Sequence, residues 1–95
     1  MRHKNTDLIN VICDGSMKAA VEIAARHDFL NIVNPKAICD ALKIEIKNGY
    51  KLAAREAKDA LIVNEKWAQA TLNASCVSFA QNALIRCGYL GEGES

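Results

Sequence analysis

The chain has 95 residues, of which 51% are apolar, 5% aromatic and 24% charged, and its formal net charge is +1. This length supplies one hydrophobic core and excludes two separate domains. The apolar fraction excludes an intrinsically disordered chain, and the balanced charge excludes a global field that would attract nucleic acid or a membrane. We therefore expect one helical domain over residues 1–95, with frayed ends at 1–5 and 89–95.

Turn and capping residues divide the first third of the chain into two expected helices. Thr6 is a candidate N-cap of a short helix that ends at Asp14 and Gly15, and Ser16 is a candidate cap of the next helix. Residues 29–33 could continue that second helix or form an extended connector. Apolar residues three or four positions apart predict the buried faces: Leu8, Ile9, Ile12 and Cys13, then Met17, Ala20, Val21, Ala24 and Ala25.

A third helix is expected to begin at Asn34, because Pro35 follows this N-cap residue at the first helical position. We expect it to end at Asn48 and Gly49. Residues 43–52 could instead form a β-hairpin around this Asn-Gly pair, but its register would leave no single apolar face, so the helix end is the preferred interpretation. The predicted inward residues are Ala37, Ile38, Ala41, Leu42 and Ile46.

The second half of the chain is strongly helix-forming, with Asn64 as a break or bend and Ser75 as a candidate cap of a last segment that Gly88 ends. Residues 50–87 could therefore form one long helix or several. The predicted fold class is all-α, a single compact bundle of four to five helices with short connections. The predicted inward lines are Ala53, Ala54, Ala57, Ala60 and Leu61, then Cys76, Phe79, Ala80, Ala83, Leu84 and Cys87.

Residues that could carry chemistry are dispersed along the chain. The cysteines form no C-x-x-C pair, the two histidines are isolated, and no glycine-rich phosphate loop is present. Most carboxylates have a basic residue three or four positions away, as on a helix surface. We expect no enzymatic activity, catalytic residue, metal, cofactor or small-molecule substrate. The four cysteines are expected to be structural, with at least three of them on apolar lines: Cys13, Cys39, Cys76 and Cys87.

The N-terminal residues lack the apolar region of a signal peptide, and no stretch of about 18 uncharged apolar residues could span a membrane. We therefore expect a cytoplasmic protein without membrane contact, whose cysteines are reduced thiols.

An uncharged run over residues 67–85 is the first candidate functional feature. It is rich in neutral polar residues, as expected for a central helix or for a helix that packs on another chain. Trp67 is the candidate interface anchor, with burial in the core as the other interpretation. The hypothesis is a non-enzymatic interaction or regulatory protein that presents a helical surface to a protein partner or to its own copy, through Trp67, Thr71, Ser75, Ser78 and Asn82.

Residues 36–58 carry six basic against three acidic residues and support an alternative, DNA-binding function. Ala41, Leu42 and Lys43, with Gly49 six residues later, resemble the end of the recognition helix in winged helix-turn-helix repressors, and residues 22–24 could lie in its supporting helix. No Arg, Asn or Gln lies between Pro35 and Lys47 to contact base edges. The alternative therefore uses phosphate contacts alone, through Lys36, Lys43, Lys47, Lys51 and Arg55.

Overall fold

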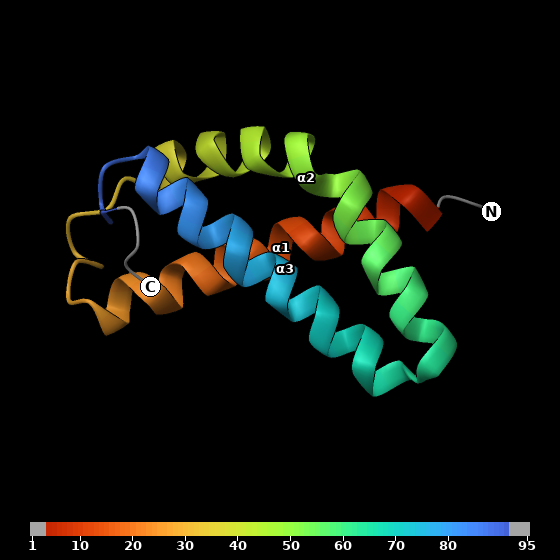
Figure 1. Ribbon diagram of the computed structural model, residues 1–95. Helices are drawn as coiled ribbons and strands as arrows, with labels where there is room; N and C mark the ends of the chain where they lie inside the picture. The colour runs from red at the N-terminus through yellow and green to blue at the C-terminus, as the bar shows by residue number, and fades with distance from the viewer. Residues whose placement is uncertain (1–3, 92–95) are drawn as a thin grey trace.

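A computed structural model describes residues 4–91, with side chains from Leu8 onward. This part of the chain forms three helices, α1 (Lys4–Arg26), α2 (Pro35–Val63) and α3 (Glu65–Arg86), and no strand (Figure 1). The all-α prediction is confirmed, whereas the prediction of four to five helices is wrong. Two of the expected helix ends do not exist, because α1 and α2 each continue through a glycine.

Helix α1 runs through the residues that were expected to divide it. A Cβ atom added to Gly15 would lie 2.8 Å from the Sγ atom of Cys76, so this glycine permits close approach of α1 and α3. Ser16 is fully buried and lies inside the helix, which excludes the predicted capping role. The inward line of α1 therefore differs from the predicted one: Val21, Ala25 and Ile9 are exposed, and the buried residues are Ile12, Ser16, Ala19, Ala20, Ile23 and Ala24.

Residues 27–34 connect α1 to α2. Asp28 has a φ of 62°, and the N–H of Phe29 donates to the carbonyl oxygen of Ala24 over 2.9 Å. This left-handed residue and the backward hydrogen bond are the features of a Schellman helix end. Of the two alternatives for residues 29–33, continuation of the helix is wrong, and these residues form a connector made of turns.

Helix α2 begins as predicted, since the Asn34 side chain accepts hydrogen bonds from the N–H groups of Lys36 (3.0 Å) and Ala37 (3.3 Å). The prediction that it ends at Gly49 is wrong, and residues 43–52 are helical rather than a β-hairpin. A Cβ atom at Gly49 would lie 2.7 Å from the Phe79 ring. Glycine is accommodated here because an aromatic side chain of α3 occupies the space beside the α2 backbone.

Asn64 is the single residue between α2 and α3, and it caps both helices. Its N–H donates to the carbonyl oxygen of Ala60 (3.1 Å), and its side chain accepts from the N–H of Trp67 (2.7 Å). The chain reverses here, so that α3 returns along α2 as a helical hairpin (Figure 1). The prediction that Ser75 caps a helix is wrong, because α3 is continuous through this residue. The Ser75 hydroxyl instead donates to the carbonyl oxygen of Thr71.

The hydrophobic core lies where α1 crosses the α2–α3 hairpin (Figure 1). Tyr89 and Leu90 complete it after α3 ends: the Tyr89 hydroxyl accepts from the N–H of Asn34 (2.8 Å), its ring stacks on Phe29, and Leu90 is buried. Fraying from residue 89 is therefore not seen at these two residues; residues 1–3 and 92–95 lie outside the described part. The core residues from the helices are Ile12, Ala19, Ala20, Ile23, Ile38, Ala41, Leu42, Ile46, Ala53, Phe79, Ala80, Ala83 and Leu84.

Residues 54–71, which we call the outer hairpin, are much less buried than this core. They comprise the last turns of α2, Asn64 and the first turns of α3, and only Ala60 among them is buried. Leu61, a predicted inward residue, is 54% exposed, and the adjacent Ile62 is 85% exposed. No helix within residues 4–91 combines the length and the hydropathy that a membrane span requires.

Candidate protein-interaction site

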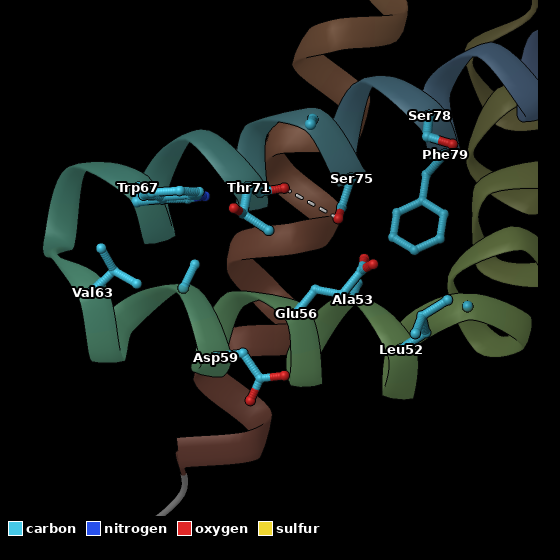
Figure 2. A pocket seen from close by; sticks show the side chains of 13 residues that line it. Leu52, Ala53, Glu56, Asp59, Val63, Trp67, Thr71, Ser75, Ser78 and Phe79 are labelled. Atoms are coloured by element: carbon cyan, nitrogen blue, oxygen red, sulfur yellow. Dashed lines mark hydrogen bonds between the residues drawn. The ribbon is translucent and has the colours of Figure 1, made fainter.

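A groove of about 700 Å³ opens between the second half of α2 and the first half of α3 (Figure 2). The α2 wall and the α3 wall contribute similar numbers of side chains. The lining residues are Gly49, Leu52, Ala53, Glu56, Asp59, Ala60 and Val63 from α2, and Trp67, Thr71, Ala74, Ser75, Ser78 and Phe79 from α3.

Side-chain size shapes this groove. Ala53 and Ala60 are buried, and such small residues let the two helix backbones approach each other. Phe79, only 8% exposed, closes the inner end. Leu52 and Val63, by contrast, are 57% and 59% exposed, so the groove has a narrow alanine floor between large, accessible apolar side chains.

Four of the five predicted interaction residues line the groove. Trp67, Thr71, Ser75 and Ser78 are spaced four, four and three residues apart, which places them on one face of α3. Asn82 lies nearer the end of α3, is exposed, and is not part of the lining. Trp67 is 57% exposed, so the alternative that it fills the core of the isolated chain is wrong.

The residues of the opposite wall of the groove were not predicted from the sequence. Leu52, Glu56, Asp59 and Val63 are spaced four, three and four residues apart and therefore share one face of α2. This spacing is visible in the sequence. It was not used because the predicted inward line of this segment ran through Ala57 and Leu61 instead of Val63.

The groove is acidic as well as apolar. Glu56 and Asp59 are its only charged lining residues, and no lysine, arginine or histidine lines it. Neither carboxylate has a cationic partner: within residues 8–91 the ion pair is that of Arg86 with Glu45, at 2.7 Å, outside the groove. Two carboxylates without an ion-pair partner among the described residues thus stand on the α2 wall, one helical turn apart.

The five predicted phosphate-binding residues all lie exposed along α2. Their spacing of seven, four, four and four residues places them on one side of the helix, which we call the basic face: Lys36, Lys43, Lys47, Lys51 and Arg55. None of them lines the groove. The helix continues past Gly49 for 14 residues to Val63, so the recognition-helix end expected at this glycine is not formed.

The four cysteines are free thiols. The Cys76 thiol is buried and donates to the carbonyl oxygen of Ile12, while Cys39 is exposed. Burial raises the pKa of Cys13, Cys76 and Cys87, which favours the protonated thiol over the reactive thiolate. Among the described residues, no three His, Cys, Asp or Glu side chains come together as a metal site would require.

Comparisons of the chain with protein-family models, with curated proteins and with solved structures found no match in any of the three. The groove is therefore interpreted from its own geometry and chemistry.

Proposed function

We propose that the protein is an interaction module whose groove, between α2 and α3, binds a helical segment of a protein partner. The observation that supports this function is that three large, exposed apolar side chains, those of Leu52, Val63 and Trp67, lie around one groove. Covering each such side chain contributes about 1.5–3 kcal/mol relative to full exposure, less in proportion to the part already buried. A tryptophan at the edge of a groove is also the residue type that most often dominates a protein interface.

The function can be tested by affinity capture from the native cell with the wild-type protein and two groove variants, Trp67→Ala and Val63→Asp. We expect the wild type to retain at least one protein that both variants lose. Ile62→Asp is the matched control, because Ile62 is adjacent to Val63 and 85% exposed but does not line the groove. Circular dichroism establishes that all variants are folded.

Two results would remove this proposal: a set of captured proteins that is the same for wild type and groove variants, or no captured protein at all. The version in which the partner is a second copy is tested separately, by light scattering over a concentration series. A wild type that remains monomeric at all concentrations excludes that version.

DNA binding through phosphate contacts is a second candidate function, supported by the basic face of α2. Its five cations are exposed, and none forms an ion pair within the described residues. Affinity for duplex DNA should fall steeply with salt and should be weaker in Lys47→Gln and Lys51→Gln than in wild type. Trp67→Ala should leave it unchanged, because Trp67 is not part of the basic face. Absence of binding at low ionic strength would eliminate this candidate.

A further inference from the structure

The composition of the groove indicates what kind of helix it accepts. We propose that its occupant is an amphipathic helix of another protein, with Lys or Arg beside its apolar face. This inference rests on the proposed interaction function and adds the chemistry of the partner. It combines two properties of the same groove, its exposed apolar rim and its unpaired carboxylates.

The dimensions of the groove favour a helix as the occupant. From Leu52 to Val63 the α2 wall rises over 11 residues, or about 16 Å at 1.5 Å per residue, which equals about three helical turns. The α3 wall runs back beside it, so the groove is a furrow between two neighbouring helices (Figure 2). An amphipathic helix fills such a furrow with apolar residues spaced three and four positions apart. The alanine floor leaves room for those larger side chains.

The carboxylates determine the charge of the occupant. Any helix that covers the groove removes water from around Glu56 and Asp59, which is unfavourable unless each negative charge gains a hydrogen-bonded or cationic partner. The groove itself offers no cation. Lysine or arginine on the occupant would supply one and would also accelerate the encounter, whereas acidic side chains would add repulsion.

The same charges disfavour pairing of this groove with the groove of a second copy. A twofold interface places the same surface on both sides. Glu56 and Asp59 of each copy would then face their equivalents, with four carboxylates and no lining cation between them. We therefore assign the groove to a basic helix of a different protein rather than to self-association.

Two designed peptides test the charge preference. Each has about 18 residues and the same leucines at three- and four-residue spacing, flanked by lysine in one peptide and by glutamate in the other; neither contains tryptophan. Binding is followed by calorimetry and by the fluorescence of Trp67, the single tryptophan of the chain. We expect the lysine peptide to bind at least about tenfold more tightly than the glutamate peptide at low salt, with a smaller ratio at about 0.5 M salt.

Charge variants assign the preference to the groove. The double variant Glu56→Gln, Asp59→Asn should bind the two peptides with affinities within about twofold of each other. Asp40→Asn is the matched control, because Asp40 is an exposed carboxylate on α2 that does not line the groove, and it should keep the wild-type ratio. Trp67→Ala should weaken binding of the lysine peptide.

The inference is overturned if the wild type binds neither peptide, if both bind equally, if the double variant keeps the preference, or if Trp67→Ala binds the lysine peptide as the wild type does. A wild-type dimer that Trp67→Ala dissociates would also overturn it. These outcomes are separate from failure of the proposed function. Capture that depends on Trp67 and Val63 would still support a protein-binding groove, with an occupant of different charge.

Discussion

The crossing region, where α1 packs on α2 and α3, and the outer hairpin are built from the same helices but stabilised differently. In the crossing region, large side chains such as Ile23, Ile38 and Leu84 are almost fully buried by residues from other helices. In the outer hairpin, Ala60 is the one buried residue, and nine of the ten residues from Leu61 to Ala70 are exposed. Although α2 and α3 are continuous helices, their packing differs between the two regions, and we expect the outer hairpin to be the less stable part.

The difference also separates stability from function. Burial of large side chains stabilises the crossing region. The outer hairpin leaves Val63 and Trp67 accessible beside a groove, and such a surface gains stability when a partner covers it. The region with the smallest share of the core is thus the region with the clearest binding surface.

The largest effect is expected from removing a core side chain of the crossing region. Leu84 is fully buried, so Leu84→Ala should lower the free energy of unfolding by about 2–5 kcal/mol. Leu61→Ala removes the same atoms from the outer hairpin, where Leu61 is 54% exposed. It should change the free energy of unfolding by less than about 1 kcal/mol. Urea titrations followed by circular dichroism measure both. Similar losses in the two variants would mean that the two regions are equally packed.

The close approach of α1 and α3 is tested at Gly15. Alanine normally stabilises a helix interior by about 0.5–1 kcal/mol relative to glycine. Here its Cβ would lie 2.8 Å from the Cys76 Sγ atom, so Gly15→Ala should instead lower stability by about 1–3 kcal/mol. Adding Cys76→Ala removes the sulfur and should make the Gly15→Ala change less harmful, as a double-mutant cycle of thermal unfolding would show. A stabilising Gly15→Ala would indicate a wider separation of the helices.

The cap at Asn64 tests the outer hairpin specifically. Asn64→Ala removes the hydrogen bond to the N–H of Trp67 and should cost about 1 kcal/mol. We expect faster hydrogen exchange in residues 56–71 and little change around Leu84, because the outer hairpin can open while the crossing region stays folded. Uniformly faster exchange over both regions would contradict a division into two parts of different stability.

A buried hydroxyl in the crossing region has no hydrogen bond of normal geometry. Ser16 is fully buried, and its Oγ atom has no partner within hydrogen-bond limits, although it lies close enough to the Cys76 thiol to oppose the rise of that thiol's pKa. Ser16→Ala should therefore leave stability unchanged or raise it by up to about 1 kcal/mol. Ser75→Ala is the comparison, because the Ser75 hydroxyl donates to a carbonyl oxygen. If Ser16→Ala instead lowered the free energy of unfolding by more than about 1 kcal/mol, the Ser16 hydroxyl would have a hydrogen-bond partner.

The smallest effect is expected at the ion pair between Arg86 of α3 and Glu45 of α2. Both the Nε and Nη2 atoms of Arg86 donate to one carboxylate oxygen of Glu45, at 3.0 and 2.7 Å. Because the arginine is 46% exposed, Arg86→Ala should cost only about 0.5 kcal/mol, and the cost should shrink at high salt. Thermal unfolding at two salt concentrations measures it. A loss that does not depend on salt would point to packing of the arginine stem.

Local patterns in the sequence were sufficient for several parts of this structure. The all-α class follows from residue spacing, the start of α2 from Asn34 and Pro35, and the C-terminal inward line from the spacing between Cys76 and Leu84. Four groove residues on α3 were also identified, because they form a run without charge. Each of these features depends on residues that lie within about one helical turn of each other, and such short-range patterns can be read directly from the sequence.

The sequence by itself shows that cations gather in residues 36–58 and that residues 67–85 carry no charge, although the net charge of the whole chain is balanced. Only the tertiary structure shows that α1 and α2 continue through Gly15 and Gly49, where Cys76 and Phe79 of α3 occupy the space that side chains at those positions would need. That continuity sets the direction of every later residue of α2 and brings Glu56 and Asp59 opposite the uncharged face of α3. The acidic groove is therefore a product of packing between helices, which no local pattern specifies.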